Sequence, residues 1–272
     1  LLCDASLGVL KEASELAAIG FKAVHAEGLT GVHRVTPAVL EAMEAYNSAC
    51  PAHNPPYVRA MRLLAEKLPH IPLVAAFETG FHQTIPITRQ LYAIPQEWVK
   101  LGIRRYGFHG ASHRYIAERA VALLQKPDLK LISCHLGGSS SLCAISHGKS
   151  LAISMGFSPQ SGLPQNNRVG GIDIFTLPVL LQKTGKTLNT LLAELANQSG
   201  LDGLSGVGND LRDIETAAEQ GNENAQLAME VYVEAIRHYL GSFLVALGGA
   251  DAIVFTGGIG ENSASIRSAI CS

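Results

Sequence analysis

The sequence predicts a mixed α/β protein in which sheets and helices form layers. Short β-rich runs alternate with longer helical patterns along the 272 residues. His147-Gly148 lies between two such runs and is typical of a tight hairpin turn. Hydrophobic residues make up 47% of the chain and charged residues 16%, which supplies enough apolar surface for a large core and excludes a disordered chain. Interleaved strands and helices with one hairpin meander favour a layered α/β fold.

Helices are expected wherever apolar residues recur at helical spacing among good helix formers. Thr36 is a suitable N-cap with Pro37 in the first turn, and Ser112 opens another helix. The expected helices are Val9–Ala18, Pro37–Tyr46, Val58–Leu68, Ser112–Leu124, Leu177–Thr184, Leu188–Gln198, Asp213–Glu219 and Asn224–Leu247.

Strands are expected in short runs that are rich in β-branched and aromatic residues. These runs are Phe21–His25, Leu73–Phe77, Leu129–His135, Leu142–Ser146, Ser150–Ser154 and Ala252–Thr256. Residues Leu129 to Ser154 should form a three-stranded antiparallel meander. The proline-dotted stretch from His82 to Gln96 is the expected boundary between a helix-rich first third and the remainder.

Composition narrows the class of protein. The net charge of −2 gives no global argument for binding nucleic acid or an anionic membrane. No run approaches the ~20 apolar residues that a membrane span needs. The five cysteines contain no C-x-x-C pair, so free thiols in a reducing cytoplasm are expected; they are Cys3, Cys50, Cys134, Cys143 and Cys271. Both ends of the chain lie inside helical patterns, and we interpret the chain as a fragment.

Three glycine-rich turns could bind an anion: His135–Ser141, Thr256–Ser263 and Gly203–Asp210. Small residues let backbone N–H groups approach a phosphate, and the second turn leads into a helix whose N-terminus favours one. None is a Walker A loop or a G-x-G-x-x-G fingerprint. Each alone is also compatible with an ordinary tight turn, but three in one chain favour a nucleotide cleft.

Two histidines four residues apart raise the question of a metal site. His109 and His113 could face one metal ion from a helix, but Gly110 interrupts the helical pattern and no glutamate follows His109. We therefore place His109 in a loop and His113 in the first turn of a helix, with arginines nearby to hold negative charge.

Four other polar residues are candidates for chemistry. His53 lies in a proline-bounded turn, and Glu78 and His82 follow a predicted strand, where catalytic groups gather in α/β proteins. Arg168 lies among polar and flexible residues and has the planar donor fork that suits a transferring phosphoryl group. The structural alternatives are a hydrogen-bonded histidine, a solvated carboxylate and a surface arginine.

Several segments in order resemble the acetate kinase family, over a range from about Ala18 to Ser272. The matching segments are Pro51–Pro55, Phe81–Thr84, Gly102–Tyr115, Ser154–Pro159, Ser199–Gly206 and Gly257–Ser263. Members of this family transfer phosphoryl groups between ATP and short-chain carboxylates.

The resemblance implies a two-domain, actin-like phosphotransferase fold of the acetate and sugar kinase, heat-shock chaperone and actin type, with ribonuclease-H-like sheets flanked by helices. Residues 1–82 would be part of the N-terminal domain, and residues 83–272 the C-terminal nucleotide-binding domain. The implied reaction is reversible transfer of the ATP γ-phosphoryl group to acetate, giving acetyl phosphate and ADP, with propionate as the alternative acceptor. It also implies Mg²⁺, a homodimer and a cytoplasmic location, without nucleic-acid or membrane partners.

Site residues are transferred from the family position by position. Glu78, His109 and Arg168 match catalytic positions, and Lys22 and His53 match substrate-binding positions. The implied nucleotide-binding residues are His135, Leu136, Gly137, Gly138, Ser139, Asp210, Leu211, Arg212, Gly258, Ile259, Gly260, Glu261 and Asn262. The magnesium ligands are expected in terminal segments outside this chain, and no residue of this chain is assigned as a metal ligand.

The chain departs from the family pattern near the proposed chemistry. Glu78 stands for an aspartate, Lys22 for an arginine, and Gly138-Ser139 for asparagine and glycine. The family's Gly-Thr-Arg-Ser-Gly-Asp becomes Asn166–Gly171 around Arg168. These changes leave open a nucleotide-binding protein on the same fold that has lost phosphoryl transfer. A metal-dependent hydrolase built on His109 and His113 is a third reading.

Overall fold

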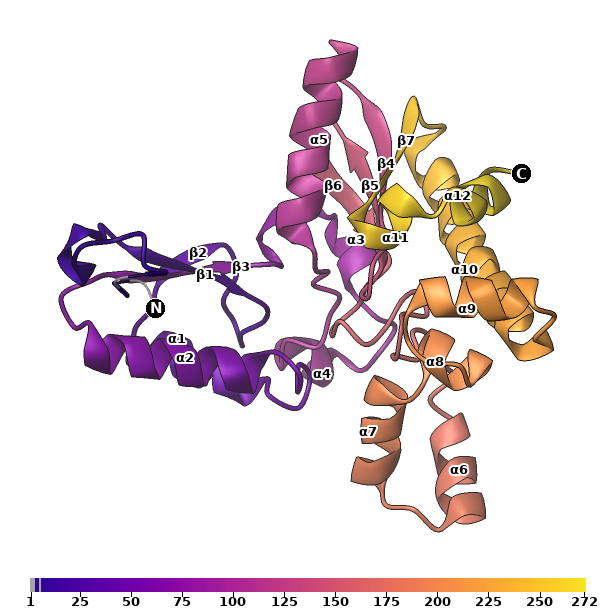
Figure 1. The fold of residues 1–272 in the computed structure, drawn as a ribbon, viewed down its shortest axis with the longest axis horizontal. Coiled ribbons are helices and arrows are strands. Elements are labelled where there is room, and N and C mark those ends of the chain that lie inside the picture. The colour runs from indigo at the N-terminus through magenta and orange to yellow at the C-terminus, as the bar shows by residue number, and fades with distance from the viewer. Residues whose placement is uncertain (1–2, 5) are drawn as a thin grey trace.

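Two sheets with helices packed on them form the molecule (Figure 1), and the computed structural model describes residues 3–4 and 6–272. The first sheet has the strand order β1-β3-β2. Strand β1 (Ile19–Ala23) is parallel to β3 (Leu73–Phe77), and β2 (Val32–Arg34) is antiparallel to it. Helices α1 (Pro37–Ala45) and α2 (Asn54–Lys67) bury apolar side chains against this sheet.

The second sheet has the order β6-β5-β4-β7. Strands β4 (Lys130–His135), β5 (Ser141–Ser146) and β6 (Lys149–Ile153) form the predicted antiparallel meander. Strand β7 (Ala252–Thr256) then adds parallel to β4. The long connection that a parallel pair needs is supplied by the segment that contains α10 (Glu223–Leu247).

Alternate residues of β4 serve two separate cores, because neighbouring side chains of a strand point to opposite faces. Leu131 packs with Ala117 and Ala120 of α5 (Gly110–Leu124). Ile132 and Cys134 pack with apolar residues of α10, including Ile236 and Leu240. Helices therefore cover both faces of the second sheet, which fixes the ends of β4 and β7 in a rigid frame (Figure 1).

Six further helices lie in the second half of the chain. Helices α6 (Thr176–Thr184) and α7 (Leu188–Asn197) form a hairpin that projects from the body at the bottom of Figure 1. They are followed by α8 (Gly200–Ser205), α9 (Leu211–Glu219), α11 (Gly257–Asn262) and α12 (Ala264–Cys271). Among the described residues, no helix has the length and apolar character needed to cross a membrane.

One predicted helix is wrong. The segment Val9–Ala18 contains only the single 3₁₀ turn η1 (Ala13–Glu15), and the side chain of Val9 is 86% exposed. A short helix is marginal in water unless its apolar face is well packed, and here Val9 is exposed while Leu10 and Leu16 are only partly buried.

Other differences concern boundaries and short elements. Helix α2 begins at Asn54 rather than Val58, because Pro55 and Pro56 are tolerated in a first helical turn. Strand β1 is shifted by two residues from the predicted Phe21–His25. The structure adds β2, η2 (Gly80–Thr84), α3 (Ile87–Gln90), α4 (Gln96–Lys100), α8, α11 and α12. The predicted domain boundary after residue 82 falls inside η2 and stays a prediction.

Candidate functional site

The ends of strands from both sheets bring the first group of predicted site residues together. Lys22 lies on β1, Glu78 directly follows β3, and His135 is the last residue of β4. His109 immediately precedes α5, and the backbone N–H of Gly110 donates to the carbonyl oxygen of Glu78 at 3.0 Å. A Cβ on residue 110 would lie 2.2 Å from that oxygen, so this junction requires glycine.

Serine hydroxyls hold the histidines of this region in place. Nδ1 of His109 lies 2.8 Å from Oγ of Ser141, and the His109 ring lies 4.3 Å from the His135 ring between centroids. Oγ of Ser141 also lies 2.8 Å from Nε2 of His113, whose Nδ1 lies 3.0 Å from Oγ of Ser133. Both nitrogens of His113 are therefore engaged, which weighs against its serving as a metal ligand in the third reading.

The other predicted histidines differ in what they contact. His82 is buried, with Nε2 2.8 Å from the carbonyl oxygen of Phe108 and Nδ1 2.9 Å from Oγ of Ser150, so its ring joins the β3 end to the second sheet. His53 precedes α2, and its Nδ1 is buried with no hydrogen-bond partner. Within the described residues, His53, His109 and His135 each keep a ring nitrogen that makes no hydrogen bond, and in His53 that nitrogen is buried.

Burial and the positive charges of Lys22 and Arg168 lower the pKa of both His109 and His53. Burial lowers the pKa of His109 well below its usual value, and the charges of His135, Lys22 and Arg168 lower it further. Burial, then Arg168 and Lys22, lowers the pKa of His53 to about 4. These imidazoles are neutral near pH 7, so Lys22 and Arg168 supply the positive charge of this region.

Glu78 brings a carboxyl group to the same place. Its side chain is buried, and burial raises its pKa, while the Lys22 charge and the backbone N–H of His109 act in the opposite direction. Lys22 and Glu78 line a hollow of about 660 Å³ together with Phe81, Gly110 and Ala111. Lys22 and Glu78 thus border an open space large enough for a small ligand.

Two of the glycine turns lie side by side. His135 pairs with Thr256 at the adjacent ends of β4 and β7, and the N–H of Leu136 donates to the carbonyl oxygen of Thr256 at 2.8 Å. The N–H groups of Ile259 and Gly260 both donate to the carbonyl oxygen of Leu136. The N–H groups of Ile259 and Gly260 are therefore used within the fold. Any N–H donors to a phosphate must come from the other residues in the ranges 135–139 and 258–262.

The third glycine turn, Gly203–Asp210, ends at the N-terminus of α9, and α9 is hydrogen-bonded to the second turn. Asp210 caps α9 by accepting from the N–H of Arg212, whose Nε also donates to the Asp210 carboxylate at 3.0 Å. These hydrogen bonds lower the pKa of Asp210 to about 2. Further along α9, Glu215 accepts from Oγ of Ser263 at 2.6 Å, which joins α9 to the end of the second turn. Leu211, predicted near the nucleotide, is buried in the core.

Arg168 is joined to the first glycine turn by a contact that sequence reasoning missed. Its Nη1 donates to Oγ of Ser139 at 3.3 Å and to Oε1 of Gln165 at 3.2 Å. Oγ of Ser139 donates to the same Oε1 at 2.6 Å. The only sequence signal was a run of amide residues, Gln165-Asn166-Asn167, directly before Arg168.

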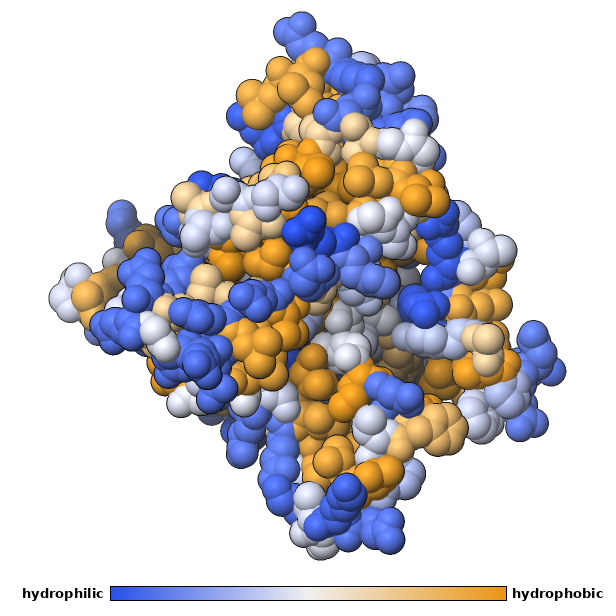
Figure 2. All heavy atoms as spheres, turned by 90° about the vertical axis from the view of Figure 1, so that its right-hand side faces the viewer, coloured by the Kyte–Doolittle hydropathy of each residue, from blue (hydrophilic) through white to orange (hydrophobic). Residues whose placement is uncertain are grey.

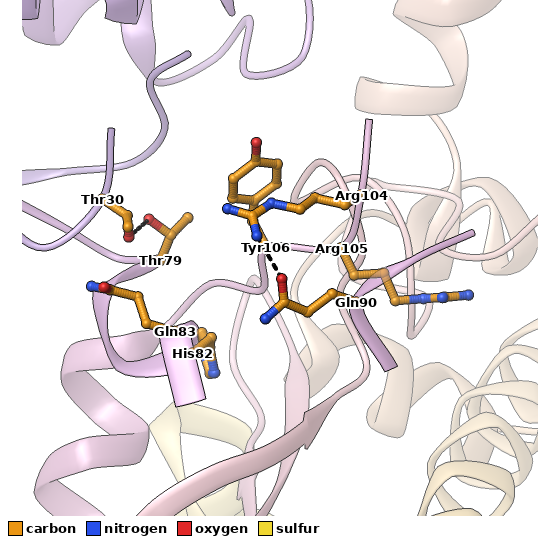
Figure 3. A pocket seen from close by; sticks show the side chains of 8 residues that line it. All are labelled: Thr30, Thr79, His82, Gln83, Gln90, Arg104, Arg105 and Tyr106. Carbon is orange, nitrogen blue, oxygen red and sulfur yellow. Dashed lines mark hydrogen bonds between the residues drawn. The ribbon is translucent and has the colours of Figure 1, made fainter. Parts of the chain in front are cut away.

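A second hollow of about 180 Å³ is lined by His82 and by Thr79, which directly follows Glu78 (Figure 3). In it, Nη1 of Arg104 donates to Oε1 of Gln90 at 2.6 Å, and the hydroxyls of Thr30 and Thr79 lie 2.6 Å apart. Apart from His82, none of its lining residues was a sequence candidate.

The described residues contain no group of three or more His, Cys, Asp or Glu side chains arranged to hold a metal ion. Mg²⁺ prefers near-octahedral oxygen ligands, commonly one or two carboxylates with substrate phosphates. Glu78 contributes one carboxyl group to this region.

Comparison of the sequence with known proteins identifies the family of the chain. The family model described as "Acetokinase family" matches residues 4–272. The chain is 44% identical over 264 residues to an acetate kinase of Bacillus subtilis (strain 168), covering 96% of this chain and 67% of that protein. It is 43% identical over 275 residues to an acetate kinase of Methanosarcina acetivorans, covering 100% and 67%.

Solved structures agree. The crystal structure of Porphyromonas gingivalis acetate kinase matches with a TM-score of 0.88 and 38% identity, covering 100% of this chain and 69% of that one. A propionate kinase from Francisella tularensis subsp. tularensis SCHU S4 matches with a TM-score of 0.90 and 36% identity, covering 96% and 68%. These likenesses confirm the predicted fold class. The chain spans about two thirds of the length of these relatives, and the expected position of the magnesium ligands outside it stays a prediction. By sequence and by fold, the chain belongs to the acetokinase family.

Proposed function

We propose that the protein transfers the γ-phosphoryl group of ATP to a short-chain carboxylate and forms an acyl phosphate and ADP, in a reversible reaction. Acetate is the default acceptor, and the likeness to a propionate kinase supports propionate as the alternative. The observation that carries the proposal is the convergence of Lys22, Arg168 and the histidines on the end of β4, where the first glycine turn begins.

Phosphoryl transfer needs positioning and positive charge around the transferring oxygens more than it needs covalent help from the protein. Arg168 suits that role because, within the described residues, its guanidinium makes no ion pair with a carboxylate. A carboxylate acceptor is already ionised near pH 7, so it needs no strong general base. In this proposal, Glu78 orients neighbouring groups, and neutral His109 offers a hydrogen bond to the transferring group.

The nucleotide would lie along the glycine turns. Residues 135–139 and 258–262 would surround its phosphates, and residues 210–212 would lie nearer the adenosine. The adjacency of the first two turns supports this placement. We propose that Mg²⁺ binds together with ATP and would neutralise part of the negative charge of the phosphates.

A homodimer in the cytoplasm completes the proposal. The five cysteines are free, which fits a reducing compartment. The projecting α6–α7 hairpin and the residues directly before α6 expose apolar side chains. Ile174 is 68% exposed and Phe175 is 77% exposed. Figure 2 shows hydrophobic side chains among the polar ones at its lower end, where this hairpin lies. Clustered exposed apolar residues commonly mark a protein contact.

The test is an assay of the full-length protein with Mg-ATP and acetate, propionate or butyrate, in which hydroxylamine traps the acyl phosphate as a hydroxamate. We expect product with at least one acid, and a fall in kcat of about 10²–10³ for Arg168→Ala. No hydroxamate with any acid would contradict the proposal. If calorimetry then showed tight ATP binding, the second candidate, a nucleotide-binding protein without transfer, would be favoured; the departures at Glu78 and Lys22 motivate it.

A further inference from the structure

The side-chain amide of Gln165 is fully buried and is hydrogen-bonded at both its oxygen and its nitrogen. Its exposed fraction is 0%. Nε2 donates to the carbonyl oxygen of Pro159 at 2.8 Å, and Oε1 accepts from Oγ of Ser139 at 2.6 Å and from Nη1 of Arg168 at 3.2 Å. A buried amide satisfied at both ends is held in one orientation.

The partners fix which way that amide points. The carbonyl oxygen of Pro159 can only accept, so the NH₂ group must face it and Oε1 must face Arg168. Oε1 can also only accept, so the hydroxyl hydrogen of Ser139 points toward it. The lone pairs of the Ser139 hydroxyl then remain to accept from Nη1 of Arg168 at 3.3 Å.

The backbone around Gln165 is equally constrained. Its N–H donates to the carbonyl oxygen of Arg168 at 3.0 Å, and its carbonyl oxygen accepts from the N–H of Leu201 at 2.9 Å. The N–H of Asn166 donates to the carbonyl oxygen of Gly138 at 3.3 Å. Residues 165–168 are thus tied both to α8 and to the first glycine turn, so a shift of one would move the others.

Both acceptors that hold Arg168 are uncharged. A carboxylate at the same place would pair with the guanidinium and offset the charge that a phosphoryl group needs, whereas an amide and a hydroxyl restrain it and leave its charge intact. One guanidinium nitrogen, Nη1, makes both contacts, and the N–H groups on Nε and Nη2 take no part in them.

We propose that Gln165 and Ser139 are positioning residues that hold one edge of the Arg168 guanidinium against residues 135–139 and leave its other N–H groups for the transferring phosphoryl oxygens. This inference rests on the proposed function. Ser139 stands where the family resemblance leads us to expect glycine, so its part in the contact is a particular feature of this chain.

Kinetics of Gln165→Leu and Ser139→Gly test the proposal in the full-length protein. We expect kcat to fall about 10–100-fold for Gln165→Leu and less for Ser139→Gly, with KM for ATP changed by less than about threefold, because the lost restraint acts on the transition state. Gln160→Leu is the matched control: it makes the same change in the same loop, and Oε1 of Gln160 has no hydrogen-bond partner. A kcat for both variants equal to that of the control would overturn the proposal.

A charge variant separates positioning from simple packing. Gln165→Glu has nearly the same shape and keeps an acceptor for Ser139 and Arg168, but it loses the donor to the carbonyl oxygen of Pro159. Gln165→Leu also loses that donor, so a kcat lower in Gln165→Glu than in Gln165→Leu isolates the effect of the added charge. The proposal predicts at least a tenfold lower kcat at pH 7.5, because the carboxylate pairs with Arg168. Wild-type kcat in this variant would show that an uncharged acceptor is not required.

A chemical readout keeps the inference separate from the proposed activity. Phenylglyoxal modifies free guanidinium groups, and mass spectrometry of the peptide that contains residue 168 measures the rate for Arg168. We expect the rate to rise at least about threefold in Gln165→Leu and in Ser139→Gly, and to stay unchanged in Gln160→Leu.

If the wild type made no acyl phosphate but these rates changed, the proposed function would fail and the positioning would stand. Equal rates in all four proteins would refute the positioning. Because Ser139 is only partly buried, its variant remains informative if Gln165→Leu does not fold.

Discussion

Glu78 and Gly110 are joined by a backbone hydrogen bond of 3.0 Å that connects the end of β3 in the first sheet to the start of α5, which packs on the second sheet. His109 lies between them in chain order and has a left-handed backbone, with φ 58. A non-glycine residue in that conformation is uncommon and persists where its surroundings hold it. The carboxyl group of Glu78 and the imidazole of His109 are therefore placed relative to each other by one junction.

Gly110→Ala should disrupt that junction. The added Cβ would lie 2.2 Å from the carbonyl oxygen of Glu78, so backbone must move, and we expect a loss of about 1–3 kcal/mol in the free energy of unfolding. Urea unfolding measures it. Gly241→Ala in α10 is the control, because nothing lies within 4 Å of its Cβ position and alanine is the better helix former. Equal stability of Gly110→Ala and the wild type would show that the junction can relax.

Lys22→Met should move the pH dependence of activity. The Lys22 charge lowers the pKa of Glu78, against the effect of burial, so removing it lets that pKa rise further. If Glu78 acts as a carboxylate, the acid limb of the kcat/KM profile then moves to higher pH. Lys22→Arg keeps the charge and should leave the limb in place. The same limb in all three proteins would mean that Glu78 does not set it.

Stability should fall as the pH drops from about 6.5 toward 4. Burial lowers the pKa of His82 to about 4, below the ordinary value of 6.5, so the unfolded chain binds more protons than the native state in this range. The contribution of His82 is present above about pH 6.5, and about 3 kcal/mol of it is lost by pH 4. Urea midpoints at several pH values measure this slope.

His82→Gln should make that slope shallower, because the variant has no imidazole to protonate on unfolding. His238→Gln, at an exposed position on α10, is the control and should keep the wild-type slope. An unchanged slope in His82→Gln would mean that other groups dominate the acid response.

Only two thiols should react with iodoacetamide in the native protein. Cys3 and Cys271 are exposed, whereas Cys50, Cys134 and Cys143 are buried. Burial also raises the pKa of Cys50 and of Cys143 to about 12, which removes their reactive thiolate near pH 8. Mass spectrometry should show two labels in native conditions and five in denaturant. Fast labelling of Cys50, which lies near Arg168, would indicate that this region opens in solution.

Elements with local signals, and the family, could be predicted from the order of the residues alone. Strands β3 and β7 have the predicted bounds, and the meander follows from β-rich runs on either side of His147-Gly148, because strand period and turn chemistry are properties of neighbouring residues. The three residues of β2 carry no such signal; they form a strand because β3 offers them an open edge.

How the candidate site is held together depends on contacts between distant segments. Val9–Ala18 has a helical pattern, but its apolar side chains are at most partly buried, and the segment forms a single 3₁₀ turn. Sequence reasoning placed Arg168 and the glycine turns among the candidates but had no means of pairing Ser139 with Gln165, 26 residues apart. That hydrogen bond arises when two loops meet in the folded chain, and a contact between distant residues leaves no periodic pattern in the sequence of either loop.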